Sequence, residues 1–229
     1  ELPRLADAYP SLIRKEDNEE VLFQLMRAAL KALPQGCEPQ PEIASAIHAR
    51  IDTMSPRLEA VALAVLGRSK DKTALDRLNK RAKEDRYVLS VVALSAIGEI
   101  GSHRGLETAL QISNHSDPER RLRAAGALGG IGNAVATDRL VALVTTDEDL
   151  DVRRAALRAL KHGTAGIENP ADLSPKSSDD PLALEIVQVR LAAVQKRAGL
   201  SLDEVDESLR NAIPGFSPKA VSRVSPDAV

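Results

Sequence analysis

The sequence predicts an all-α fold, an α-solenoid in which about five or six helical hairpins stack into a right-handed superhelix. Three observations predict it: an internal repeat, a composition of small and aliphatic residues, and the absence of strand patterning. Hydrophobic residues make up 43% of the 229 residues and aromatic residues only 2%, so the core must consist of Ala, Leu, Ile and Val, which favour closely packed helices. No segment alternates apolar and polar residues with the period of two that a half-buried strand requires.

An apolar helical pattern recurs five times, at steps of 31 to 33 residues. In each copy an Ala is followed three positions later by Ala or Val and four positions later by Leu or Ile. The copies begin at Ala29, Ala62, Ala93, Ala124 and Ala156. Each unit is too small to bury its apolar face alone, so the copies must stack and share one core.

Helix-ending and helix-starting residues bound the copies. Gly101 and Gly132 stand where a left-handed residue ends a helix, and Gly163 is expected to do the same. Helix starts are predicted at Ser55-Pro56, at Asp117-Pro118, and at Asp149 or Asp151. A shorter apolar pattern follows each stop, so every repeat is predicted to be a helical hairpin.

The two ends depart from the repeat. Near the N-terminus, helices are expected over residues 2–13 and 18–33, whereas the Pro-, Ser- and Asp-rich stretch after Gly163 is typical of a loop. The prediction is a single domain, residues 1–229, with these parts: an N-terminal cap (1–24), regular repeats (25–163), a long loop (164–181), a C-terminal capping hairpin (182–213) and a tail (214–229) that is disordered unless a partner holds it.

Two stretches carry a resemblance to a known family. Residues 117–132 read Asp-Pro-Glu-Arg-Arg-Leu-Arg-Ala-Ala-Gly-Ala-Leu-Gly-Gly-Ile-Gly, and residues 151–160 read Asp-Val-Arg-Arg-Ala-Ala-Leu-Arg-Ala-Leu. They resemble the short HEAT-like repeats named after the phycobilisome lyases, and the resemblance covers residues 25–163. It implies an α-solenoid. Its functional implication is broad, because such repeats act as scaffolds in many settings.

Six arginines are the candidate partner-binding residues. They lie on the first helices of adjacent repeats, where part of the set should form a stripe: Arg120, Arg121, Arg123, Arg153, Arg154 and Arg158. A stripe of guanidinium groups suits phosphates, carboxylates or an acidic protein. The alternative is that the arginines pair with Glu119, Asp149 and Asp151 in a ladder between repeats.

The sequence predicts no catalytic residues, no metal site and no cofactor. None of the histidines has a His partner at i+4 or belongs to a His-Glu pair: His48, His103, His115 and His162. The same absence argues against the HEAT-repeat hydroxylases, whose iron ligands come from such pairs. Residues 129–132 read Gly-Gly-Ile-Gly but follow a helix and lack a Lys-Ser/Thr, so a helix end is expected there rather than a phosphate loop. Cys37 is predicted to be a bystander thiol.

Composition narrows the choice of partner. A net charge of −2 and the absence of Trp argue against a nucleic-acid partner, including the HEAT-like glycosylase alternative. The apolar runs are far shorter than the roughly 20 residues that span a bilayer. A single Cys fits the cytoplasm, and Glu1 in place of Met favours a processed chain or a piece of a larger protein. We therefore predict a non-enzymatic, cytoplasmic scaffold or adaptor that binds another protein, in a larger complex. A bilin lyase subunit or related chaperone is the alternative that the resemblance implies.

Overall fold

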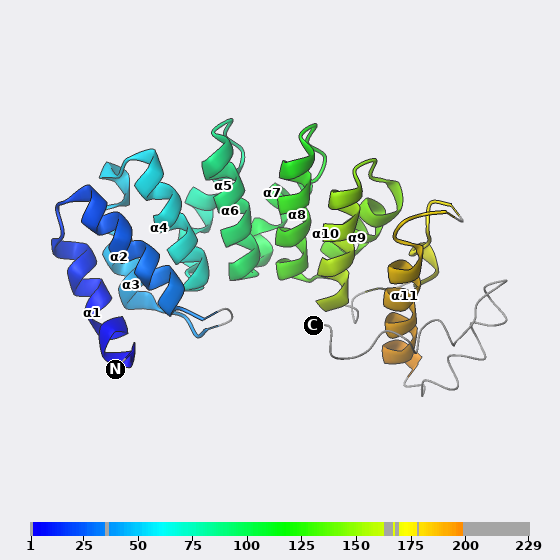
Figure 1. The fold of residues 1–229 in the computed structure, drawn as a ribbon, viewed down its shortest axis with the longest axis horizontal. Helices are drawn as coiled ribbons and strands as arrows, with labels where there is room; N and C mark the ends of the chain where they lie inside the picture. The colour runs from blue at the N-terminus through cyan, green and yellow to red at the C-terminus, as the bar shows by residue number, and fades with distance from the viewer. Residues whose placement is uncertain (1, 35–36, 163–166, 168–169, 178, 199–229) are drawn as a thin grey trace.

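The computed structural model is a stack of helices in two layers (Figure 1). It describes residues 2–34, 37–162, 167, 170–177 and 179–198. These residues form eleven α-helices and no strand, which confirms the predicted all-α solenoid. The helices are α1 (Leu2–Lys15), α2 (Glu19–Ala32), α3 (Pro41–His48), α4 (Pro56–Arg68), α5 (Leu75–Ala82), α6 (Tyr87–Ile100), α7 (Leu106–Ile112), α8 (Pro118–Ile131), α9 (Ala134–Thr146), α10 (Leu150–His162) and α11 (Ala183–Ala198).

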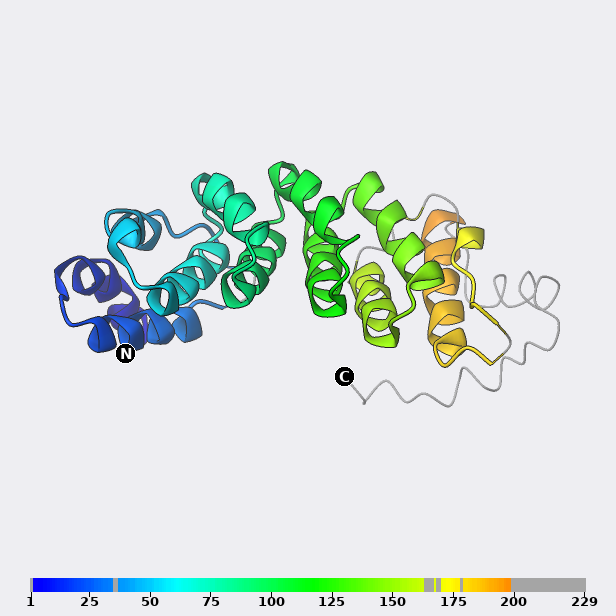
Figure 2. The same cartoon turned by 90° about the horizontal axis from the view of Figure 1, so that it is seen from above.

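Helices alternate between the two layers. The five copies of the alanine pattern form α2, α4, α6, α8 and α10, which pack side by side in chain order. The odd-numbered helices α1 to α9 form the second layer behind them, and α11 packs against α10 at the end of the stack. Seen from above, the even-numbered layer lies on the inner side of a shallow curve (Figure 2). We call the two layers the inner and the outer layer.

Small residues set the distance between neighbouring inner helices. A Cβ atom added to Gly67 of α4 would lie 2.6 Å from the Cβ of Ala96 in α6. Between α6 and α8 the backbones meet directly, since a Cβ on Gly130 would lie 2.0 Å from the carbonyl oxygen of Gly98. The outer helices α5, α7 and α9 pack against one another far less extensively than the inner helices in front of them. The stack bends toward its inner layer (Figure 2).

The predicted helix stops are confirmed where the structure describes them. Gly101 (φ 67°) and Gly132 (φ 63°) are left-handed and end α6 and α8. Lys70 occupies the equivalent place after α4 with φ 58°, a conformation that is costly for a residue with a Cβ. Gly163 lies outside the described residues. Side-chain oxygens cap the predicted starts at Ser55, Asp117 and Asp149.

The segment before α11 contains a 3₁₀ turn, Pro170–Asp172, which packs against α11. Ile167 and Leu173 beside it are buried. The segment thus lies where an outer helix would otherwise cover the stack. The second half of the predicted capping hairpin and the predicted tail lie outside the described residues. No helix in the described part of the chain has both the length and the apolar character needed to cross a bilayer.

The close approach of α6 and α8 makes Gly130 intolerant of a side chain. Gly130→Ala should lower the free energy of unfolding by about 1–3 kcal/mol, because the new methyl group overlaps the Gly98 carbonyl. Gly126 lies in the same helix, and a Cβ there meets no atom within 4 Å. Gly126→Ala should therefore stabilise by about 0.5–1 kcal/mol. Urea unfolding measures both, and equal effects of the two substitutions would contradict backbone contact between the helices.

Candidate partner-binding face

The repeat register shows which residues the inner layer presents outward. Three sets of equivalent positions on α4, α6, α8 and α10 are exposed or half-buried, whereas Ala62, Ala93, Ala124 and Ala156 of the repeat pattern are buried. The three rows are Arg57, Val88, Glu119 and Asp151; Val61, Val92, Arg123 and Ala155; and Ala64, Ser95, Gly126 and Arg158. Together with the facing residues of α2, we call this surface the inner face.

Three depressions lie on the inner face between α2 and α10. The first, of about 810 Å³, lies between α2, α4 and α6 and is lined mainly by apolar residues such as Phe23, Leu30, Val61 and Val92. We call it the apolar groove. The second, of about 630 Å³, lies between α6, α8 and α10 and includes Arg123 and Arg158. The third, of about 400 Å³, lies between the first turns of α8 and α10. The inner face therefore changes from apolar to charged along the stack.

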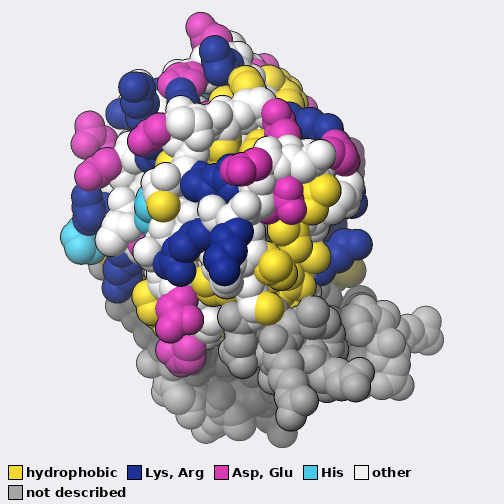
Figure 3. All heavy atoms as spheres, turned by 90° about the vertical axis from the view of Figure 1, so that its left-hand side faces the viewer, with side chains coloured by type: hydrophobic (Ala, Val, Ile, Leu, Met, Phe, Trp, Pro, Cys, Tyr) yellow, Lys and Arg dark blue, Asp and Glu magenta, His cyan; other side chains and the backbone are white. Residues whose placement is uncertain are grey.

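Figure 3 views the N-terminal end of the stack, with the inner layer on the right. Hydrophobic side chains gather on that side, and basic side chains lie beside them. The exposed apolar residues of this region include Tyr87, 48% exposed, and Val88, 62% exposed. Large apolar side chains at such exposure form a surface that a partner can cover.

Arg120 and Arg121 of the predicted stripe are held within the stack. Arg120 is buried and donates a hydrogen bond to the carbonyl oxygen of Glu84 at 3.2 Å. Arg121 forms a two-pronged ion pair with Asp147, both N–O distances being 2.9 Å. Burial raises the pKa of Asp147, but hydrogen bonds from Arg121 and from the Asp149 backbone outweigh it and leave the pKa below its ordinary value. These two arginines join neighbouring repeats rather than facing solvent.

Arg153 is also buried, and it connects α10 to the segment that leads into α11. Its Nε donates to the carbonyl oxygen of Val144 at 2.7 Å, and its Nη2 pairs with Asp180. The hydrogen bond from Arg153 lowers the pKa of Asp180 to about 2, against a burial effect that raises it. Asp180 also accepts from the backbone N–H of Lys176 and Leu182, at 2.7 and 3.0 Å, just before α11 begins.

Of the other three arginines, Arg123 and Arg158 belong to the rows of the inner face, and Arg154 lines the third depression beside Arg158. Arg123 pairs with Glu119 at 2.7 Å and Arg154 with Asp151 at 2.8 Å, each within its own helix. Arg158 is exposed and has no ion-pair partner among the described side chains. The predicted ladder between repeats is formed by Asp147 instead of Asp149, whose side chain caps α10.

One register position is polar and largely buried on α4, α6, α8 and α10, and the sequence reasoning did not single it out. Its occupants are Glu59, Ser90, Arg121 and Arg153. Glu59 accepts from Arg81 of α5 at 2.8 Å, and Ser90 donates to the carbonyl oxygen of Ala82 at 2.7 Å. Each occupant connects its inner helix to the outer layer or to a connecting loop. The signal was available, since a polar residue stands three positions before each of the pattern alanines Ala62, Ala93, Ala124 and Ala156.

His48 and Cys37 have local structural contacts. His48 Nε2 lies 2.5 Å from Asp71 Oδ2, and Thr73 lies against both side chains. Burial raises the pKa of Asp71, but the hydrogen bonds from His48 and Thr73 lower it by more. The Cys37 thiol donates to the carbonyl oxygen of Arg68 at 3.2 Å. Among the described residues, no group of three or more His, Cys, Asp or Glu side chains could hold a metal ion.

Two layers of hairpins with one continuous core define the chain as an α-solenoid repeat protein. Residues 81–161 match the HEAT repeats family, in agreement with the resemblance that the sequence shows. Comparison of the sequence with curated proteins gave no match.

Solved structures of low identity share the fold. The complex of CpcE and CpcF of phycocyanin lyase from Nostoc sp. PCC7120 is 20% identical over 67% of this chain and 98% of that chain, with a TM-score of 0.51. A designed armadillo repeat protein is 16% identical over 90% of this chain and 96% of that chain, with a TM-score of 0.50. An engineered protein is 21% identical over 86% of this chain and 99% of that chain, also with a TM-score of 0.50. At these identities the likeness concerns the fold alone.

The buried pair at the end of the stack predicts a large loss of stability. Asp180→Asn should lower the free energy of unfolding at pH 7 by about 3 kcal/mol, because it leaves the Arg153 guanidinium buried without a counter-charge. Asp151→Asn, which breaks the more exposed pair with Arg154, should change it by at most about 1 kcal/mol. Urea unfolding followed by circular dichroism measures both, and similar losses would show that Asp180 is not held in a buried pair.

The same pair predicts a pH dependence. The pKa of Asp180 lies at about 2 in the folded state and near 3.8 in the unfolded state, so its stabilising effect is complete above 3.8 and is lost as the pH falls through 2. Unfolding free energies of the wild type should therefore fall more steeply between pH 4 and pH 2 than those of Asp180→Asn. Parallel pH profiles for the two proteins would contradict the lowered pKa.

Proposed function

We propose that the chain is a non-enzymatic scaffold or adaptor of the cytoplasm that binds a partner protein on its inner face. The observation that carries this proposal is the set of three depressions between α2 and α10. Solenoids form extended concave surfaces of this kind because each repeat adds one more ridge to the same side. The side chains on these ridges vary between repeats, while the core beneath them repeats.

The charged half of the inner face supplies the recognition of acidic groups. Arg123 and Arg158 line the second depression, and Arg154 and Arg158 line the third. A guanidinium group binds a carboxylate through two parallel hydrogen bonds. Arg120, Arg121 and Arg153 serve this surface from inside, because their contacts fix the helices that carry the exposed arginines.

Charge reversal on the inner face tests the proposal. The tagged full chain is used to capture proteins from a lysate of its source, and the captured partner is then purified and titrated by calorimetry. Arg123→Glu with Arg158→Glu should weaken partner binding about tenfold or more, since two attractions become repulsions. Thermal unfolding should stay within a few degrees of the wild type, because both side chains reach solvent.

Lys72→Glu with Lys80→Glu is the matched control. It makes the same change in net charge at two exposed positions in and just before the outer helix α5. The affinity for the partner should stay unchanged. Equal loss in both double variants would indicate a nonspecific charge effect, and no loss in either would remove the arginines from the interface. Visible absorbance of the captured material would instead support the bilin lyase alternative.

A further inference from the structure

The apolar groove has the shape of a seat for a helix. Phe23, Arg27 and Leu30 form a ridge along α2, at the i, i+4 and i+7 positions of one helix face. On α4 a second ridge contains Arg57, Val61 and Ala64 at the same spacing. Parallel ridges on neighbouring helices leave a groove that accepts the side chains of a third helix. The small Ala60 and Ala64 side chains deepen the groove on the α4 side.

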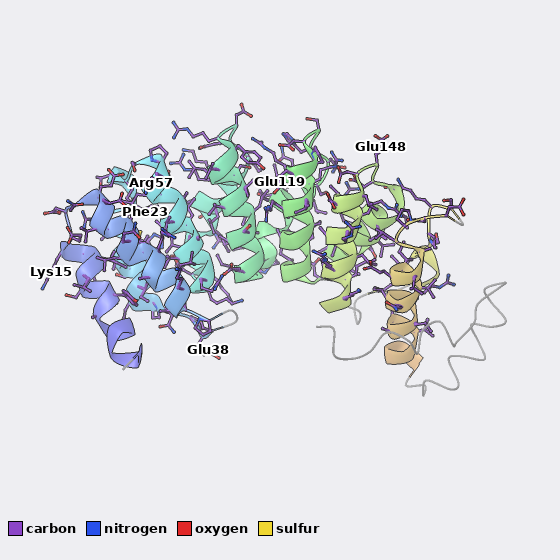
Figure 4. The ribbon with its side chains drawn as sticks, in the orientation of Figure 1. Lys15, Phe23, Glu38, Arg57, Glu119 and Glu148 are labelled. Atoms are coloured by element: carbon purple, nitrogen blue, oxygen red, sulfur yellow. The ribbon has the colours of Figure 1, made fainter. Side chains whose placement is uncertain are left out.

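The charged residues that line the apolar groove are all basic: Arg27, Arg57 and Arg86. The Arg57 guanidinium lies 3.9 Å above the centre of the Phe23 ring, and Figure 4 shows these two side chains next to each other on α4 and α2. Its acidic partner, Glu20, lies 3.0 Å away and is itself exposed to solvent. Arg27 and Arg86 form no ion pair with any described side chain. This excess of positive charge contrasts with the net charge of −2 of the whole chain.

The exposure of the groove selects its occupant. A small-molecule site encloses most of the surface of its ligand. Here Val88 is 62% exposed and Tyr87 48% exposed at the edge of the groove, so a small ligand would remain largely in water. A helix lying along the ridges would cover both side chains and bring further residues to the arginines. Recognition of one amphipathic face in an apolar groove is an established mode of peptide binding.

We propose that the apolar groove binds an amphipathic helix of a partner protein, whose apolar face carries Leu-like residues at i, i+3, i+4 and i+7 and is flanked by Asp and Glu. The apolar side chains lie over Phe23, Val61 and Val92. The flanking carboxylates pair with the arginines of the groove. This inference rests on the proposed function, since it names the chemistry of a partner of the inner face.

A model peptide tests the groove directly. The probe is a fluorescein-labelled helix with Leu at the stated spacing, Glu beside each Leu and Ala elsewhere, and its matched control carries Gln in place of Glu. Fluorescence anisotropy with the full chain should give at least about tenfold tighter binding of the Glu peptide, and the difference should shrink at high salt. Equal binding of the two peptides, or no binding of either, would overturn the proposal.

Substitutions in and outside the apolar groove test where the Glu peptide binds. Val88→Glu places a negative charge in the groove and should weaken Glu-peptide binding about tenfold or more, as should Arg57→Glu with Arg86→Glu. Val135→Glu makes the same substitution on α9, at a residue 52% exposed on the outer layer, and should leave binding unchanged. Circular dichroism and the melting temperature confirm that each variant folds. Equal effects of Val88→Glu and Val135→Glu would overturn the assignment to the groove.

Two other occupants would also overturn it. Self-association of the chain in sedimentation velocity, abolished by Val88→Glu, would assign the groove to a second copy. Saturable binding of oleate that competes with the peptide, at a higher affinity, would assign it to a small apolar carboxylate. Failure of the peptide tests while a captured partner still depends on Arg123 and Arg158 would remove this inference and leave the proposed function standing.

Discussion

The arrangement of the stack depends on the close approach of neighbouring inner helices. Glycines of one helix lie directly against the backbone or an alanine methyl group of the next. Gly98 and Gly129 have no side chains to hold the helices apart and face Ala127 and Ala159, whereas Gly130 faces the backbone of Gly98. The outer helices α5, α7 and α9 pack against one another less extensively, and the stack curves toward the inner layer. The hollowed inner face results from this curvature and from the ridges that each repeat contributes.

Close packing of small residues does not by itself fix how each inner helix is positioned against the outer layer. Small apolar surfaces can slide over one another. The polar position occupied by Glu59, Ser90, Arg121 and Arg153 supplies directional contacts at each step. In a solenoid each repeat contacts only its neighbours, so every interface must be specified separately. A buried charge without a partner is costly. The loop that supplies each partner must therefore hold it within hydrogen-bonding distance.

The repeat predicted all five inner helices and two of their stops, because both depend on local spacing and on glycine. Aligning the repeats also identifies Arg120 as a core position, since its equivalents are Leu58, Leu89 and Val152. The partner of Arg153 could not be predicted, because Asp180 lies in a segment with no counterpart in the other repeats. Nor could the apolar groove, because it requires the register between α2 and α4, where the repeat step lengthens to 33 residues.

Backbone contact between α6 and α8 also gives the molecule a mechanical asymmetry. The carbonyl oxygen of Gly98 lies so close to Gly130 that these helices cannot approach further without a steric clash. Separation is opposed more gradually, by exposure of the apolar residues that α6 and α8 bury between them. The inner layer is therefore stiffer against compression than against extension at this joint.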